Sequence, residues 1–254
     1  MSGSLSVVGL GPGGLDTLTP EAAVCLQGAD ALYGYGPYLD RVPERRGQAR
    51  HSSDNREEGA RARDALNHAA TGASVALVSG GDPGVFAMAA AVCEQIEGGA
   101  EAWRSLNVAI VPGITAMLAV AARVGAPLGH DFCAISLSDN LKHWSVIERR
   151  LDAAASGGFV TALYNPISRA RPWQLGMAFE RMRRYLPAST PTVFGRAIGR
   201  TGERVTVISL GAADPSIADM ATLIIVGSAL TRVIERPGMT PLVYTPRSAG
   251  LSGA

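Results

Sequence analysis

The chain has 254 residues, of which 47% are hydrophobic and 18% charged, and its formal net charge is +1. This composition is typical of a globular protein with one large domain or two small ones, and the near-zero charge argues against a nucleic-acid-binding protein. The N-terminus shows no basic segment followed by an apolar one, and no apolar run reaches the length of a membrane span. We therefore expect a soluble cytoplasmic protein that does not act at a membrane.

Cysteine, histidine and arginine positions limit the kinds of site. The cysteines lie far apart in apolar surroundings without a C-x-x-C motif, so we expect buried thiols and neither a zinc site nor a disulfide framework. The histidines show no H-x-x-x-H spacing, and we expect no metal site. Arginines gather in clusters, which suits either a solvated surface or a small polyanionic ligand. These residues are Cys25, Cys93 and Cys133; His51, His68, His130 and His143; and Arg41, Arg45, Arg46, Arg50, Arg56, Arg61, Arg63, Arg181, Arg183, Arg184, Arg196, Arg200 and Arg204.

The chain opens with a predicted strand, Leu5–Gly9, and a glycine loop, GLGPGG. The loop matches the G-x-G-x-x-G pattern of dinucleotide-binding proteins. Pro12 argues against that function because it removes an N–H group that a pyrophosphate would need. No acidic residue ends the second predicted strand, Ala31–Tyr33, where a ribose ligand is expected. The first helix is predicted to begin at Pro20, with Thr19 as its N-cap.

The central feature of the sequence is Val75–Met88, VALVSGGDPGVFAM. Val75–Val78 has the continuous apolar pattern of a buried strand, and helical spacing begins at Val85. Glycines in the intervening run SGGDPG let a ligand approach the main chain closely. Its one charged residue, Asp82, can accept hydrogen bonds from a ligand or cap the following helix. Ligands bind outside the carboxyl ends of strands in open α/β sheets, so this run is either a ligand site or an ordinary strand–helix turn.

The remaining pattern predicts two domains. Strands and helices alternate in the first half, which indicates a parallel α/β domain over residues 1–112. The second half ends in adjacent strands, which indicates a mixed-sheet α+β domain over residues 113–244, with the ligand cleft between the domains. A poorly ordered tail is expected over 245–254. Further helices are predicted from Asp54 to Ala70, from the end of the run PGITA to Val124, from Ser138–Asn140 to Ala155, and over Trp173–Tyr185. Further strands are predicted over Val108–Val111, Phe132–Leu137, Phe159–Leu163, Thr192–Ala197, Val205–Leu210 and Leu223–Val226.

Several motifs carry a family resemblance. VGLGPGG, SGGDPGVFAMA, VPGITA, GAPLGHDF, ISLSDN and LYNPISRAR occur in this order. Together they resemble the tetrapyrrole (corrin/porphyrin) methylases, which are S-adenosylmethionine-dependent methyltransferases, from about Leu5 to Arg247. Within that family, the run HSSDNRE from His51 and the late YTPR are most similar to the branch that methylates C17 of precorrin-3B in cobalamin biosynthesis. The resemblance implies a two-domain α/β fold, usually homodimeric, with S-adenosyl-L-methionine in the interdomain cleft.

The resemblance also implies roles for particular residues. Methyl transfer goes from a sulfonium to an electron-rich carbon of the precorrin substrate, so positioning supplies most of the catalysis. The accompanying ring contraction to precorrin-4 needs a base that removes a hydroxyl proton, for which Asp82, His51 and His130 are the candidates. The cofactor-binding residues carried over by motif are Pro12, Gly80, Gly81, Asp82, Val85, Thr115, Ala116, Asn165 and Thr222, with Pro12 nearer the tetrapyrrole.

Three alternatives stay open from the sequence. A sister methylase would act at another ring carbon or on a cobalt-containing substrate. A dinucleotide-dependent oxidoreductase would use the GLGPGG loop and bind NAD(P). A non-enzymatic tetrapyrrole carrier would not need the SGGDPG run, and replacement of Asp82 would then have no effect.

Overall fold

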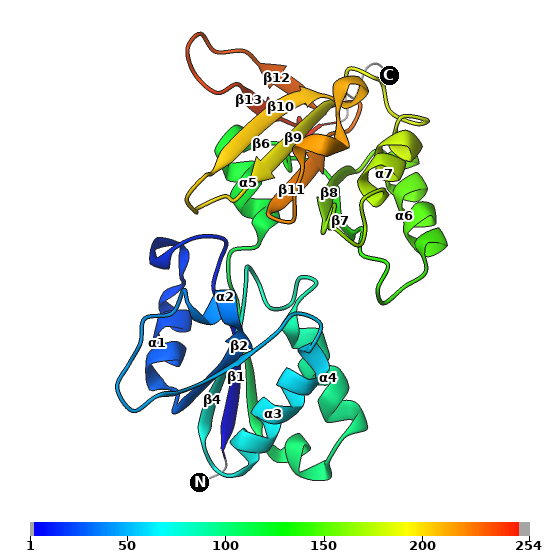
Figure 1. Cartoon of the computed structure of the whole chain (residues 1–254). Helices are drawn as coiled ribbons and strands as arrows, with labels where there is room; N and C mark the ends of the chain where they lie inside the picture. The colour runs from blue at the N-terminus through cyan, green and yellow to red at the C-terminus, as the bar shows by residue number, and fades with distance from the viewer. Residues whose placement is uncertain (1–2, 249–254) are drawn as a thin grey trace. The chain divides into compact units, whose positions relative to one another are not determined.

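The computed structural model describes residues 3–248, and the chain divides into two compact units, Met1–Thr115 and Ala116–Ala254 (Figure 1). The predicted boundary lies at residue 112, slightly before this division. Each unit has its own sheet, covered on both faces by buried apolar side chains. Within the described part of the chain, no helix is long and apolar enough to cross a membrane.

The first unit contains a five-stranded sheet in which every pair of neighbours is parallel. This confirms the predicted parallel α/β organisation. The central strands are nearly continuous apolar runs because both faces of a parallel sheet are buried. Leu77 packs in one core with Val7, and the next residue, Val78, packs in the other with Val8. In sheet order the strands are β3 (Ala49–Ser53), β2 (Ala31–Tyr35), β4 (Ser74–Ser79), β1 (Ser4–Gly9) and β5 (Asn107–Val111).

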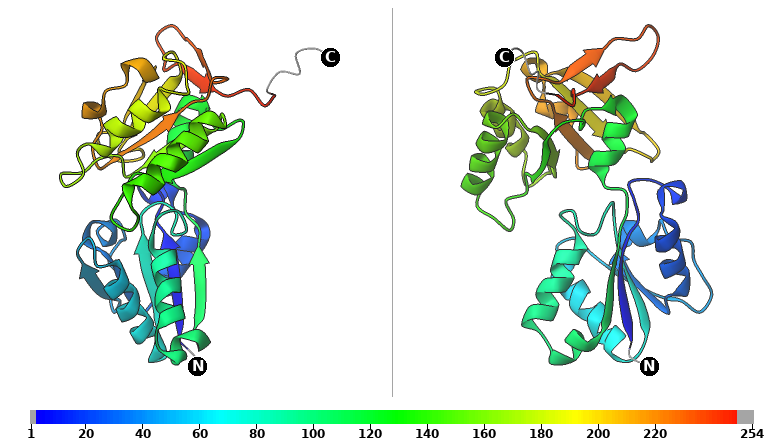
Figure 2. Two further views of the ribbon diagram at one scale, coloured as in Figure 1. Left: turned by 90° about the vertical axis from the view of Figure 1, so that its right-hand side faces the viewer. Right: turned by 180° about the vertical axis from the view of Figure 1, so that it is seen from behind.

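Helices cover this sheet on opposite faces, as Figures 1 and 2 show. Helix α1 (Pro20–Gly28), capped by Thr19 as predicted, packs on one face, whereas α3 (Glu58–Ala70) and α4 (Met88–Gly98) pack on the other. The chain therefore leaves β1 toward one face and leaves the neighbouring β4 toward the other. Such a pair of strands is a topological switch point, where ligands bind outside the carboxyl ends. The short helices of this unit are η1 (Leu15–Thr17), α2 (Gly36–Leu39) and η2 (Glu101–Ser105).

The predicted start of α3 is wrong because its capping residues form a turn ahead of the helix. The Glu57 side chain accepts a hydrogen bond from the Asp54 N–H at 2.9 Å, which is one half of a capping box. Arg56 between them has a φ of 70°, outside the helical region, and the helix begins only at Glu58. The stretch ahead of this turn contains α2 and strand β3 with His51, neither of which the sequence predicted.

Two other helices also begin later than predicted. Helix α4 begins at Met88 and not at Val85, because Phe86 has a φ of 52° that no helix continues. Helix α6 (Trp144–Ser156) begins after His143, whose side chain accepts a hydrogen bond from the Ser145 N–H. The predicted start at Ser138–Asn140 is therefore wrong.

The second unit contains a mixed five-stranded sheet, as predicted. One pair of its strands is parallel and the other neighbours are antiparallel. Helix α5 (Ala116–Val124) packs on one face, and α6 and α7 (Gln174–Met182) pack on the other (Figure 1). In sheet order the strands are β10 (Arg204–Ser209), β9 (Pro191–Arg196), β11 (Thr222–Val226), β8 (Val160–Tyr164) and β7 (Phe132–Ser136), and the short helices are η3 (Leu210–Ala212) and η4 (Pro215–Ile217).

A small third sheet in this unit is not predicted by the sequence. It consists of β12 (Arg232–Ile234), β13 (Leu242–Tyr244) and β6 (Gly125–Ala126), in that order. Thr245 directly after it is 2% exposed and donates a hydrogen bond to the Pro127 carbonyl at 2.6 Å. The predicted tail therefore does not begin at residue 245, and residues 249–254 lie outside the described part.

Cysteine and arginine side chains depart from expectation in part. Cys93 is exposed, so the prediction of buried thiols is wrong for that residue, while Cys25 and Cys133 are partly buried. Arg50 donates to the Val42 carbonyl within the stretch that follows α2, and Arg45 donates to the Ala29 carbonyl at the end of α1, so both hold this stretch in place. Among the described residues, no group of three histidine, cysteine, aspartate or glutamate side chains is placed to hold a metal ion.

Candidate functional site

Three loops meet through glycine backbones at the carboxyl edge of the first sheet. Gly9 ends β1, Gly81 follows β4 and Gly113 follows β5. A Cβ atom added to Gly113 would lie 2.3 Å from the Gly81 carbonyl oxygen, and one added to Gly9 would lie 2.6 Å from the Gly113 nitrogen. Only glycine allows main chains to approach so closely, and Gly81 also has a φ of 68°. Main-chain packing therefore fixes this edge of the sheet.

Hydrogen bonds join the same loops. Gly11 and Gly81 exchange two backbone bonds, of 3.1 and 3.0 Å. The Asp82 carboxylate accepts from the Gly84 N–H at 2.8 Å and from the Gly113 N–H at 3.1 Å, so it spans the loops after β4 and β5. Asp82 does not cap the following helix as the sequence allowed, because α4 begins later and has no side-chain cap.

The GLGPGG loop does not have the hydrogen bonding of a dinucleotide site. The N–H groups of Leu10, Gly11 and Gly13 all donate to acceptors within the protein. Pro12 has no N–H, so the stretch from Leu10 to Gly13 has no main-chain donor left for a pyrophosphate. Helix α1 also begins only at Pro20, well after the glycines. The glycine pattern therefore reflects close packing of loops and not the dinucleotide fingerprint.

Arg41 holds this loop from its other side, and the sequence did not single out that role. Its Nη2 donates to the carbonyl oxygens of Leu10, Gly11 and Gly13 at 2.8, 2.8 and 2.6 Å. The three carbonyls thus converge on one guanidinium, which is well suited to several acceptors at once. No local signal identifies Arg41 among its neighbouring arginines, because the contacts span about thirty residues of sequence.

The predicted cofactor residues of the first unit gather around this edge. Gly80 lies against the Tyr38 ring, where an added Cβ would be 2.7 Å from Cζ. Val85 donates its N–H to the Asp82 carbonyl at 3.3 Å and closes the turn. Gly80, Asp82 and Val85 are partly exposed, so a ligand can reach the loop, whereas Thr115 at the end of the unit is buried. Pro12 lies next to Gly11 in the adjoining loop.

The second unit brings its own predicted residues together. The N–H of the second residue of α5, next to Ala116, donates to the Tyr164 Oη at 3.1 Å and ties the helix start to the end of β8. Asn165 follows with a φ of 51°, and its side chain donates to the Ser136 Oγ at 3.0 Å. Thr222 begins β11, the strand next to β8, and its register partner is Arg196 on β9.

The Thr222 hydroxyl is already engaged within the protein. It donates to Asp219 Oδ1 at 2.8 Å and accepts from the Asp219 N–H at 3.0 Å. Burial opposes ionisation of Asp219, but hydrogen bonds from Thr222 and Arg196 outweigh it and hold the pKa of that carboxyl below its usual value. The Thr222 hydroxyl is therefore less available to a ligand than the Thr222 backbone.

His51 and Asp82, the two candidate bases of the first unit, are not in contact with each other. His51 lies on the edge strand β3, stacked on the Tyr33 ring at 4.3 Å, whereas Asp82 lies beyond β4, two strands away and so roughly 10 Å across the sheet. His130 belongs to the second unit, where its Nδ1 accepts from the Asp131 N–H at 2.8 Å. Among the residues that the structure describes, no hydrogen bond or ring contact joins His51 to Asp82.

Comparison with known proteins defines the family. Residues 4–214 match the family model described as Tetrapyrrole (Corrin/Porphyrin) Methylases. The chain therefore belongs to the tetrapyrrole methylases, and the resemblance seen in its motifs is confirmed. Over 247 residues it is 63% identical to the precorrin-3B C(17)-methyltransferase of Sinorhizobium sp, with 97% of each chain covered.

Solved structures agree with this assignment. The chain is similar to the methyltransferase CobJ, with 47% identity and a TM-score of 0.91, covering 96% of this chain and 100% of the other. It also shares the fold of uroporphyrin-III C-methyl transferase from Thermus thermophilus in complex with S-adenyl homocysteine. That likeness has 21% identity and a TM-score of 0.65, over 89% of this chain and 98% of the other.

Replacement of Gly113 by alanine should destabilise the first unit. The new methyl group would meet backbone atoms of Gly81 and Gly9, which cannot rotate away, so we expect the free energy of unfolding to fall by about 1–3 kcal/mol. Gly28→Ala is the matched control, since its Cβ would meet nothing within 4 Å. Calorimetric unfolding of the two variants measures the difference. A Gly113→Ala protein as stable as the control would contradict the packing described.

Proposed function

We propose that the chain methylates C17 of precorrin-3B, with contraction of the macrocycle to precorrin-4, in cobalamin biosynthesis. The methyl donor is S-adenosyl-L-methionine. The observation that carries the proposal is the glycine–aspartate loop at the switch point of the first sheet, in a chain 63% identical throughout to a precorrin-3B C(17)-methyltransferase. The homodimer expected from the family stays a prediction.

The chemistry of the loop after β4 fits such a cofactor. Gly80 and Gly81 carry no side chain that would keep a ligand from the main chain, and both are partly exposed. The loop lies outside the carboxyl end of β4, beside β1, where the chain departs to opposite faces. When bound, S-adenosyl-L-methionine supplies an electrophilic methyl group on sulfur. In the first unit Gly80, Gly81, Asp82, Val85 and Thr115 would hold it, with Pro12 in the adjoining loop, and the family resemblance adds Ala116, Asn165 and Thr222 of the second unit.

The protein contributes mainly position to this reaction. The nucleophile is a carbon of the electron-rich tetrapyrrole, so rate depends on its alignment with the methyl group. Both carboxylate oxygens of Asp82 accept backbone N–H groups, which favours a role in shaping the loop over one in proton removal. His51 and His130 stay candidates for the base that ring contraction requires.

Transfer of a labelled methyl group tests the proposal. The protein is incubated with precorrin-3B and S-adenosyl-L-methionine carrying a ¹³C methyl group, and the product is examined by mass spectrometry and NMR. We expect one labelled methyl group, attached at C17. Label on another ring carbon would replace this function by that of a sister methylase, and no transfer to any precorrin would refute the proposal.

Asp82→Ala should weaken binding of S-adenosylhomocysteine by about tenfold or more, because two N–H groups lose the acceptor that shapes the loop. Asp30→Ala is the matched control: Asp30 also accepts a backbone N–H, that of Ser74 at 2.9 Å, but at the amino end of β4. Calorimetric titration of both variants measures the affinities, and a parallel titration with NADH should show no binding. Equal losses of affinity in the two variants would argue that the loop after β4 is not the cofactor site. An Asp82→Ala protein with unchanged affinity would favour a non-enzymatic tetrapyrrole carrier.

A further inference from the structure

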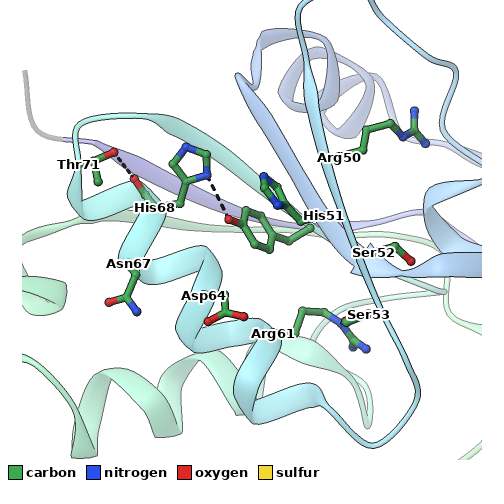
Figure 3. Close-up of a pocket in the computed structure, with 10 residues that line it drawn as sticks. Arg50, His51, Ser52, Ser53, Arg61, Asp64, Asn67, His68 and Thr71 are labelled. Carbon is green, nitrogen blue, oxygen red and sulfur yellow. Dashed lines mark hydrogen bonds between the residues drawn. The ribbon is translucent and has the colours of Figure 1, made fainter.

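A second polar cavity lies in the first unit, between strand β3 and helix α3. Its volume is about 700 Å³, and Figure 3 shows labelled lining side chains on these two elements. Tyr33 of β2 also lines it. None of the cofactor residues proposed above lines it, whereas the candidate base His51 does. The lining residues that carry the argument are Tyr33, His51, Ser53, Arg61, Asp64 and His68.

Arg61 is a buried cation in the wall of this cavity. It is 5% exposed, and its guanidinium donates to the Ser53 Oγ and the Asp54 carbonyl oxygen, each at 2.6 Å, and to the Met88 sulfur at 3.4 Å. All three partners are neutral. Among the described residues no ion pair includes Arg61, and Asp64 of the same cavity forms none with it.

A buried charge without an opposite charge is unfavourable, because desolvation is not repaid by an ion pair. The Arg61 guanidinium has five N–H groups in a planar fork and donates three hydrogen bonds, to Ser53, Asp54 and Met88. Some of its N–H groups are therefore left for another acceptor. Arg50 also lines the cavity and also forms no ion pair among the described residues, but it is only partly buried, and both of its Nη atoms donate to carbonyls of the turn over Leu39–Pro43. Arg61 is therefore the buried positive charge in this wall that lacks an anion.

The other groups around the cavity are held in a form compatible with an anion. Tyr33 Oη and His68 Nδ1 lie 3.2 Å apart in a hydrogen bond, and His51 stacks on the Tyr33 ring with an interplanar angle of 12°. Burial, together with the Asp64 carboxylate, raises the pKa of Tyr33 above its usual value, so the phenol keeps its proton. Apart from Asp64, the lining side chains are neutral or basic.

Arg61 also connects this cavity to the cofactor loop. Met88, which its guanidinium contacts, is the first residue of α4 and directly follows that loop. Ser53 is the last residue of β3, so its end of the cavity lies at the same edge of the parallel sheet as the loops after β4 and β5. A ligand group held here belongs to the same sheet edge as the proposed cofactor site.

We propose that this cavity binds a carboxylate group through the fork of Arg61, a geometry that guanidinium and carboxylate match bidentately. The proposal rests on the proposed function, which supplies two sources of that chemistry. One is a peripheral carboxylate of the tetrapyrrole, and the other is the amino-acid carboxylate of the cofactor. By binding this carboxylate, Arg61 positions the substrate relative to the cofactor, or the cofactor relative to the substrate.

The test compares two probes: uroporphyrin I, a stable tetrapyrrole with carboxylate side arms, followed by its fluorescence, and S-adenosylhomocysteine, followed by calorimetry. Arg61→Gln should weaken binding of uroporphyrin by roughly tenfold or more and leave S-adenosylhomocysteine affinity unchanged. Arg63→Gln, the same charge change at an exposed position on the same helix, is the control. Loss confined to S-adenosylhomocysteine would support the carboxylate site with the cofactor as its source.

A second variant keeps the proposal testable if Arg61→Gln does not fold. Asn67→Asp places a carboxylate at an exposed position that lines the cavity, where it would compete with and repel an anionic ligand. Asn107→Asp, exposed on β5 at the opposite edge of the sheet, is its control. Affinities for both probes within about twofold of the controls would overturn the proposal. Binding of neither probe by the unmodified protein would refute the proposed function, and this inference with it.

Discussion

Close packing of three glycine backbones is the constraint on which the first unit depends. Gly9, Gly81 and Gly113 stand at the carboxyl ends of three neighbouring strands, at separations that no Cβ atom would permit. Because the contact is between main chains, it fixes the loops relative to the sheet and not merely to one another. Asp82 then extends this arrangement by holding two backbone N–H groups from two loops. The part of the chain proposed to bind cofactor thus adjoins this close main-chain contact.

The same constraint explains why a familiar glycine pattern has an unfamiliar role. GLGPGG matches a dinucleotide fingerprint, but glycines record only that something approaches the main chain closely. Here the neighbour is the loop after β4, and the carbonyl oxygens on the other side converge on Arg41. Hydrogen bonding, and not the spacing of glycines, separates the two functions. In this chain, the hydrogen-bond partners of the loop's N–H groups, and not its glycine pattern, show that it is not a dinucleotide site.

The sequence predicted the interior of the fold well and its margins less well. Val75–Val78 is identifiable because buried parallel strands are continuous apolar runs. Thr19 is identifiable because its hydroxyl accepts the Ala22 N–H in the first turn of α1, as an N-cap does. Strand β3 was missed because it is an exposed, polar edge strand without apolar alternation. Asp54 has cap chemistry, but it serves a turn outside the helix. The role of Arg41 was not predicted because its partners lie about thirty residues away in sequence, and that of Arg61 because nothing in the sequence shows that this arginine of the cluster is buried.

Hydrogen–deuterium exchange with and without S-adenosylhomocysteine can show whether the cofactor binds at the carboxyl edge of the first sheet, because it locates the ligand on the chain without altering any residue. A ligand lying on the glycine–aspartate loop shields its N–H groups and opposes local opening. We therefore expect slower exchange in peptides that cover residues 80–88 and 112–116. Peptides at the amino ends of the same strands should exchange as before. Protection confined to segments outside these loops would contradict the assignment of the cofactor site to the carboxyl edge of the first sheet.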